Sequence, residues 1–171
     1  HEIVRVPENA GEGFDARRCD VHYDGRYSPD FYSWVFPHGP TASIGTGTHH
    51  KGFGLRESIA AFRERHGFAH WETIRREGAP LPLKPLKRWD NGRDVIVAGD
   101  AAGVVAPASG EGIYYAMASA TEVATAAEEM LATGRVAALA GARKRFMKRH
   151  GRVFLVLGIM QWFWYRNDWV R

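Results

Sequence analysis

A glycine-rich stretch, residues 98–113, carries the residues best suited to hold a ligand; it reads AGDAAGVVAPASGEGI. The carboxylate of Asp100 can accept hydrogen bonds from ligand hydroxyl groups. Gly110 and Gly112 lack Cβ atoms, so a flat ring can approach their backbone. A helix that begins near residue 111 adds unpaired N–H groups and the positive end of its dipole, which favour an anionic or electron-rich ligand. The stretch therefore predicts a ligand-binding loop.

The same stretch has a simpler interpretation. Asp100 and Ser109 are common helix caps, and the glycines can serve only to turn the chain. A P-loop is excluded because no lysine follows the last glycine, and residues 45–50, GTGTHH, have histidine where a dinucleotide fingerprint needs its last glycine. From spacing alone, a ligand site and a capped turn both remain open.

The segments around this loop predict a parallel α/β arrangement. Residues 94–98, DVIVA, form a short apolar run of the kind found in strands buried on both faces. Apolar residues then recur at spacings of three and four through residues 111–132, which predicts a helix that ends near Gly134 and whose alanines pack closely on a sheet. The loop would lie at the carboxyl end of a strand, where α/β proteins bind ligands.

An aromatic hairpin is expected further upstream. Residues 31–36, FYSWVF, are typical of a strand that ends at Pro37, and a turn at residues 39–40 leads into a partner strand over residues 41–48. Alternation along the first strand places three rings on one side, those of Tyr32, Trp34 and Phe36. From the residues alone, these rings are most simply the core of the sheet. A helix over residues 55–66 should follow.

Residues 97–113 resemble the second FAD-binding motif of flavoproteins with the para-hydroxybenzoate hydroxylase fold. The resemblance implies that Asp100 holds the ribityl chain, that Pro107 lines the flavin ring, and that the backbone of the following helix start meets the pyrimidine edge of the ring. The FAD contacts implied in this way are Gly99, Asp100, Ala101, Pro107, Gly110, Glu111, Gly112 and Ile113.

Residues 32–37, YSWVFP, followed by GTG at residues 45–47, resemble the signature of geranylgeranyl reductases within that superfamily. Residues 23–32 are similar to the chlorophyll and bacteriochlorophyll branch, and the likeness extends from about Cys19 to Tyr165. It implies NADPH-driven, FAD-dependent reduction of the geranylgeranyl chain of a prenylated tetrapyrrole, or of geranylgeranyl diphosphate, to phytyl. The residues implied to line the site for the prenyl tail are Tyr32, Trp34, Phe36, Pro37, Gly45 and Gly47.

That chemistry needs a proton and a hydride, because an isolated alkene is not polarised. An aromatic face stabilises a nearby positive charge by about 0.5–2 kcal/mol, which suits the rings of the hairpin. No proton donor stands out, and the candidates are His38, Tyr32 and Glu111. No metal is expected, since His49 and His50 should point to opposite faces of a strand and no carboxylate lies at ligand spacing from them.

The expected fold is α/β (α+β): the C-terminal part of a FAD-binding Rossmann-like flavoprotein, with an antiparallel-sheet substrate domain and C-terminal helices. Residues 1–85 are assigned to the substrate portion, residues 86–134 to the returning segment of the FAD domain and residues 135–171 to a helical portion. The family's first FAD motif, a Gly-x-Gly-x-x-Gly turn, does not appear, so we expect a piece of a longer protein that is inactive alone.

Composition restricts the partners and the compartment. The chain of 171 residues has a formal net charge of +4, spread along the sequence, and we expect no nucleic-acid partner. A single cysteine, Cys19, excludes an internal disulfide and fits a reducing compartment such as the cytoplasm. No run reaches the roughly 18–20 apolar residues needed to span a bilayer.

The C-terminal region suggests contact with a membrane surface. A helix is predicted over residues 136–150, and residues 153–165 form a separate apolar segment that ends in aromatic residues. Because residues 143–152 are basic, residues 143–165 suit peripheral attachment to the photosynthetic membrane. The alternative is a helix buried against a further part of the protein.

Three rival functions remain. A flavin monooxygenase or halogenase would share the loop at residues 98–113 but not the aromatic signature. An archaeal-type geranylgeranyl lipid reductase would share both and differ in the head group of its substrate. A non-enzymatic membrane- or pigment-binding module explains the C-terminal region but not the glycine-rich loop.

Overall fold

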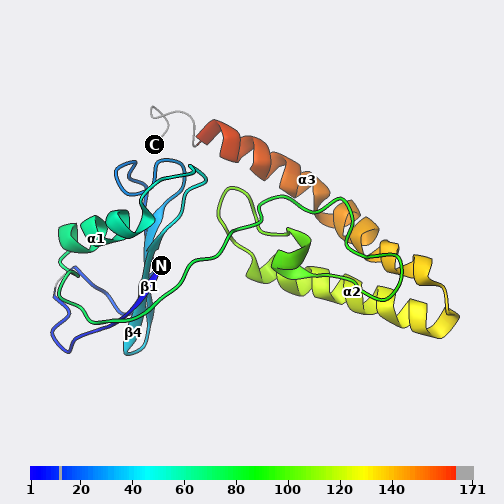
Figure 1. Cartoon of the computed structure of the whole chain (residues 1–171), viewed down its shortest axis with the longest axis horizontal. Coiled ribbons are helices and arrows are strands. Elements are labelled where there is room, and N and C mark those ends of the chain that lie inside the picture. The colour runs from blue at the N-terminus through cyan, green and yellow to red at the C-terminus, as the bar shows by residue number, and fades with distance from the viewer. Residues whose placement is uncertain (12, 165–171) are drawn as a thin grey trace. The chain divides into compact units, whose positions relative to one another are not determined.

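The computed structural model describes residues 1–11 and 13–164, which form two compact units, His1–Ala79 and Pro80–Phe163. The first unit is a five-stranded antiparallel sheet with one helix, and the second is built mainly from helices (Figure 1). The sheet has the order β2-β3-β4-β1-β5. Its strands are β1 (Glu2–Arg5), β2 (Asp20–His22), β3 (Ser33–His38), β4 (Thr41–Thr46) and β5 (Thr73–Arg76).

The predicted hairpin is present as β3 and β4. The two strands pair from Ser33↔Thr46 to His38↔Thr41, and a two-residue turn joins them. Gly39 has a φ of +63° at this turn, a conformation that glycine adopts without steric cost. Pro37 does not end the strand, contrary to the sequence prediction. Because β2 pairs with residues 33–35 of β3, Pro37 lies beyond that pairing, where a missing N–H is tolerated.

One face of this sheet packs against helix α1 (Leu55–Arg65), which confirms the helix expected at residues 55–66. The helix ends where His66 caps it and Gly67 turns with a φ of +80°. Its side chain Phe62 is almost fully buried against strand residues. The buried apolar cluster of this unit comprises Val4, Tyr27, Val35, Ala42, Ile44, Phe62, Phe68 and Trp71.

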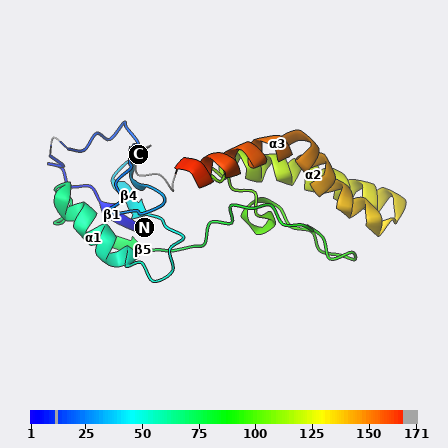
Figure 2. The ribbon, with the colours of Figure 1, turned by 90° about the horizontal axis from the view of Figure 1, so that it is seen from above.

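The second unit contains helix α2 (Ile113–Thr133) and helix α3 (Ala140–Trp164), which run side by side (Figure 2). α2 confirms the helix expected at residues 111–132 and ends at Gly134, whose φ is +67°. The two C-terminal segments expected from the sequence are instead one helix, α3, preceded by the short 3-10 helix η2 (Val136–Leu139). Of the apolar segment expected at residues 153–165, Tyr165 lies outside the described residues.

Packing explains why Gly151 does not break α3. An interior glycine costs a helix about 1 kcal/mol relative to alanine. Phe146 and Phe154, one on each side of it, are both buried in the core of the unit. Burial of such side chains contributes about 1.5–3 kcal/mol each, which outweighs the cost of the glycine.

Residues 94–98 do not form the doubly buried strand that the sequence predicts. They make one isolated antiparallel bridge, Asp90↔Ile96, and Val95 is 54% exposed. An apolar run becomes a buried strand only where neighbouring strands cover it, and no strand lies beside it within the described part of this unit.

Helix α2 buries a different face from the one its apolar spacing suggests. Ile113 and Met117 are 78% and 69% exposed. The buried positions of α2 are Tyr115, Ser119, Glu122 and Ala126. Glu122 is tied to α3 by Arg145, whose Nε donates to its carboxylate over 2.7 Å. Among the described residues, no helix combines the length and hydropathy needed to cross a bilayer.

Candidate functional site

The glycine-rich loop begins with the 3-10 helix η1 (Gly99–Ala102). The N–H of Gly99 donates to the hydroxyl of Ser119 on α2 over 2.9 Å, and the N–H of Leu86 donates to the carbonyl of Ala102 over the same distance. Gly103 ends η1 with a φ of +76°, and a Cβ there would lie 2.2 Å from the carbonyl oxygen of Lys84. These contacts fix the backbone of the loop on both sides.

Asp100 and Gly112 lie close together although twelve positions separate them. A Cβ built on Gly112 would be 3.4 Å from Oδ1 of Asp100. The Asp100 carboxylate is exposed and has no hydrogen-bond or ion-pair partner within the described chain. A shallow hollow opens here, lined by Leu81, Asp100, Val105, Gly110, Gly112, Ile113 and Ala116.

Four of the expected FAD contacts therefore share one surface, namely Asp100, Gly110, Gly112 and Ile113. Gly99 and Pro107 are buried and do not line the hollow, and Ala101 is exposed outside its lining. The N-cap residues of η1 and α2 are Ala98 and Gly112, so neither Asp100 nor Ser109 occupies the capping position predicted for it. The hydroxyl of Ser109 accepts the N–H of Glu111 over 3.3 Å, and the carboxylate of Glu111 accepts the N–H of Tyr114 over 2.8 Å.

The three aromatic rings of the hairpin lie on the sheet face opposite α1, and we call Tyr32, Trp34 and Phe36 the aromatic wall. Ring centroids are 5.9 Å apart for Tyr32 and Trp34 and 6.0 Å apart for Trp34 and Phe36. All three side chains are half-buried, whereas the intervening Ser33 and Val35 are buried toward the core. The wall is therefore a surface separate from the hydrophobic core of the unit.

Two glycines of β4 and its extension leave room for aromatic rings. A Cβ on Gly45 would lie 2.3 Å from Cζ2 of Trp34, and a Cβ on Gly47 would lie 2.8 Å from Cδ1 of Phe31. The indole Nε1 of Trp34 donates to the hydroxyl of Ser43 over 3.1 Å. The glycines that the sequence marks for the substrate site thus permit close packing of the rings on the strand.

The three candidate proton donors lie in dissimilar surroundings. Burial, followed by the neighbouring Tyr23, raises the pKa of Tyr32, which makes its hydroxyl a weaker acid. His38 is exposed at the hairpin turn, where its carbonyl accepts the hydroxyl of Thr41 over 3.2 Å. Glu111 belongs to the second unit and caps α2.

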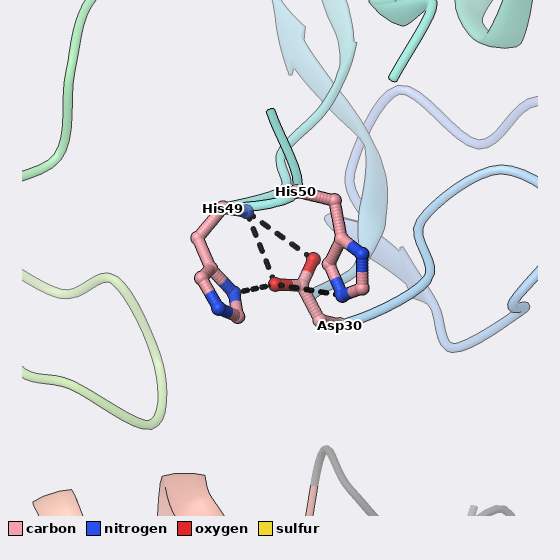
Figure 3. A group of neighbouring side chains, drawn as sticks. All are labelled: Asp30, His49 and His50. Atoms are coloured by element: carbon pink, nitrogen blue, oxygen red, sulfur yellow. Dashed lines mark hydrogen bonds and ion pairs between the residues drawn. The ribbon is translucent and has the colours of Figure 1, made fainter. Parts of the chain in front are cut away.

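A further group of side chains, missed by the sequence analysis, lies at the open end of the hairpin (Figure 3). Asp30, His49 and His50 each offer a ligand atom within 4.8 Å of the others. A carboxylate therefore lies close to both histidines in space, and the histidines lie beyond the end of β4 rather than within the strand. The register of the hairpin predicts this group, because continuing the pairing of residues 33 and 46 by three positions brings residue 30 opposite residue 49.

No family model matches the chain. The geranylgeranyl diphosphate reductase of Rhodobacter capsulatus is 55% identical over 98% of this chain and 43% of its own length. The protein of the same name from Synechocystis sp. is 37% identical over 99% of this chain and 43% of its own length. Digeranylgeranylglycerophospholipid reductase 2 of Methanothermobacter thermautotrophicus is 34% identical over 75% of this chain and 34% of its own length.

The fold has a solved counterpart. A geranylgeranyl bacteriochlorophyll reductase-like protein from Thermoplasma acidophilum superposes with a TM-score of 0.81 at 22% identity, covering 97% of this chain and 42% of that one. This likeness confirms the expected mixed α/β class with an antiparallel sheet and C-terminal helices. The chain spans about 43% of the length of the first curated relatives it matches. Across nearly all of its residues, the chain is therefore similar to part of proteins named geranylgeranyl diphosphate reductase.

Proposed function

We propose that the protein carrying this chain is a flavin-dependent oxidoreductase that reduces the geranylgeranyl chain of a prenylated tetrapyrrole, or of geranylgeranyl diphosphate, with NADPH as the reductant. The 55% identity to the Rhodobacter capsulatus reductase over 98% of the chain is the observation that carries this proposal. Residues 1–85 would serve the substrate and residues 86–134 the cofactor.

The surface around Asp100 and Gly112 fits a flavin dinucleotide. The Asp100 carboxylate has no partner in the described chain and can accept hydrogen bonds from ribityl hydroxyls. The space beside Gly112 is one that a Cβ would occupy, and the first turn of α2 directs backbone N–H groups and a positive dipole end toward it. Bound FAD would supply the hydride for reduction of the alkene.

The aromatic wall fits the prenyl tail. Its rings are half-buried, apolar and held in place, with Trp34 fixed by its hydrogen bond to Ser43 and by contact with Gly45. Such a surface excludes water from an apolar chain and places π-faces next to it. When a double bond accepts a proton, each properly placed face stabilises the positive charge by about 0.5–2 kcal/mol.

The test is a pair of substitutions at Trp34 in the complete protein. Trp34→Ala should lower turnover of geranylgeranyl bacteriochlorophyll by about 2- to 30-fold, the equivalent of one cation–π contact. Trp34→Phe keeps an aromatic face and should restore most of the rate. If the Trp34→Ala variant keeps full turnover and binds FAD normally, the aromatic wall does not take part in the reaction.

A second candidate is reduction of an archaeal-type geranylgeranyl lipid, which the 34% identity to the Methanothermobacter thermautotrophicus protein supports. The higher identity to the Rhodobacter capsulatus reductase favours the first substrate class. Competition between geranylgeranyl bacteriochlorophyll and a digeranylgeranyl glycerophospholipid distinguishes the two. Preference for the phospholipid would reverse the assignment of the head group.

We also propose that the complete protein attaches peripherally to an anionic membrane through α3. Lys144 and Lys148 are exposed near the start of the helix, and Leu155 and Ile159 are 65% and 59% exposed farther along, at spacings that place them on one stripe. A basic segment followed by an apolar one suits the headgroup layer. Arg143 and Arg145 are instead held by contacts to Leu86 and Glu122.

Co-sedimentation with phosphatidylglycerol-rich vesicles tests this attachment. The double variant Leu155→Asp/Ile159→Asp should lose most of its vesicle binding. Leu131→Asp provides the control, because Leu131 on α2 is 77% exposed and does not lie in the stripe. Equal sedimentation of all three proteins would favour the alternative, in which another part of the protein covers α3.

A further inference from the structure

Both imidazoles of the group at the open end of the hairpin approach one carboxylate oxygen. Nδ1 of His49 is in contact with Oδ2 of Asp30, and Nε2 of His50 lies 3.9 Å from the same oxygen. Figure 3 shows the two rings on opposite sides of the carboxylate. One ligand atom from each of the three side chains therefore lies within 4.8 Å of the other two.

Other groups hold the carboxylate in this orientation. The hydroxyl of Thr48 donates to Oδ1 of Asp30, so this oxygen is occupied while Oδ2 faces the rings. The N–H of His49 donates to Oδ2 over 3.1 Å, and the N–H of His50 donates to the Thr48 hydroxyl over 3.0 Å. Hydrogen bonds of this kind orient metal ligands in known sites.

The charge and exposure of the group also suit a cation. The Asp30 carboxylate accepts hydrogen bonds from the Thr48 hydroxyl and from the N–H of His49. The Asp30 side chain is 7% exposed, whereas the His49 and His50 rings are 86% and 59% exposed. A bound ion would keep its remaining coordination positions open to water.

We propose that Asp30, His49 and His50 form a binding site for a first-row divalent transition cation, with Zn²⁺ as the representative ion. Two imidazole nitrogens and one carboxylate oxygen suit Zn²⁺ and its neighbours in the series, whereas Mg²⁺ and Ca²⁺ prefer oxygen ligands. Three protein ligands and an open position resemble sites that accept a water molecule or a ligand group. The ion would join the segment before β3 to the segment after β4.

Equilibrium dialysis of the full chain against Zn²⁺, with the bound metal measured by mass spectrometry, tests the site. One Zn²⁺ per chain is expected. Thr48→Val should weaken binding by about 10- to 100-fold, as loss of an outer hydrogen bond does in other metal sites. His49→Ala and His50→Ala remove ligands and should each weaken it by more than Thr48→Val. Cobalt(II) in place of zinc should give a visible absorption band that both histidine variants abolish.

His70→Ala is the matched control, because His70 is exposed in the same unit but does not belong to the group. It should bind Zn²⁺ like the unmodified chain. Asp30→Asn removes the anionic ligand from a buried position, so the circular dichroism of this variant must first match that of the parent. If the Asp30→Asn variant does not fold, the two variants at the exposed histidines still test the site. Failure to bind Zn²⁺, binding that survives both histidine variants, or equal binding of Mg²⁺ would overturn the proposal.

Discussion

The indole of Trp34 lies directly over Gly45, its partner in the β3–β4 register. A Cβ at Gly45 would be 2.3 Å from Cζ2 and 2.6 Å from Cε2 of the indole, distances that real side chains do not reach. The absence of a side chain at one position therefore sets the orientation of the ring at the other. Because Trp34 is the middle ring of the aromatic wall, Gly45 controls the shape of the whole surface.

Gly45→Ala should displace the indole and break its hydrogen bond to Ser43. Forcing an extra methyl group into a packed site costs about 1–3 kcal/mol, and we expect that loss in the free energy of unfolding measured with urea. The near-ultraviolet circular dichroism of the variant should change as well.

Gly78→Ala is the control, because a Cβ there would meet no atom within 4 Å. Its stability should stay within about 0.5 kcal/mol of the parent, as for most surface substitutions. Equal stability of the Gly45 and Gly78 variants would show that Trp34 adjusts freely.

Local patterns predicted the helix at residues 55–66 and the face of the aromatic hairpin, because both depend on periodicity within a few residues. They failed at residues 94–98 and along α3, because burial there depends on segments distant in the sequence. The sequence predicts a helix over residues 136–150 and a separate apolar segment over residues 153–165, yet Phe146 and Phe154 share one core.

In the candidate sites, too, some features follow from the sequence and others appear only in the three-dimensional structure. The loop that carries Asp100 was located from its glycines and from the family resemblance, while the proximity of Asp100 to Gly112 appears only in three dimensions. Asp30 was missed because its partners His49 and His50 lie nineteen and twenty positions away, across the hairpin. Ligand spacing along the chain does not reveal groups assembled by strand pairing.

The buried ion pair between Glu2 and Arg63 ties β1 to α1 in the first unit. Arg63 also donates to the hydroxyl of Thr73 and to the carbonyl of Phe68, so its guanidinium is enclosed. Burial would raise the pKa of Glu2, but hydrogen bonds from Arg76, Arg63 and Thr73 outweigh it and lower the pKa. Breaking such a pair leaves a charge buried without compensation.

Glu2→Gln should therefore lower the free energy of unfolding by about 3–5 kcal/mol. Glu72→Gln serves as the control, since its ion pair with Arg5 is exposed on both sides and should contribute no more than about 1 kcal/mol. Urea denaturation of both variants at neutral pH measures the difference. Similar losses in the two variants would mean that the buried pair contributes no more than a surface one.

His150 should make the second unit sensitive to acid. Its ring lies among those of Tyr114, Tyr115 and Phe146, and burial, followed by repulsion from Arg149, lowers its pKa below 6.5, with Glu122 opposing the shift. The unfolded chain therefore binds this proton more readily than the folded one. Stability is fully present above pH 6.5 and falls as the pH drops through the region between the unfolded and folded pKa values.

His150→Phe removes the titrating group and keeps a ring in the core. Melting temperatures between pH 5 and 7.5 should depend less on pH in this variant than in the parent. Some dependence should remain, because burial also lowers the pKa of His66 in the first unit. A parallel pH dependence in variant and parent would show that His150 titrates alike in folded and unfolded chains.

Gly112→Ala tests the cofactor surface separately from the fold. The backbone of Gly112 has a φ of −126°, which any residue adopts, and the added Cβ would make ordinary contacts of 3.4 Å with Asp100 and Val105. The variant should therefore fold like the parent. Because the methyl group projects into the hollow proposed for FAD, it should weaken FAD binding to the complete protein by about tenfold, or 1.4 kcal/mol.

Gly103→Ala is the contrasting change in the same loop. Its Cβ would lie 2.2 Å from the carbonyl oxygen of Lys84, at a φ of +76°, so it should damage folding first and lose FAD only as a consequence. Fluorescence titration with FAD, paired with thermal melting, separates the two effects. If Gly112→Ala binds FAD as tightly as the parent while melting at the same temperature, the flavin does not approach the start of α2, and the role proposed for this helix end is wrong.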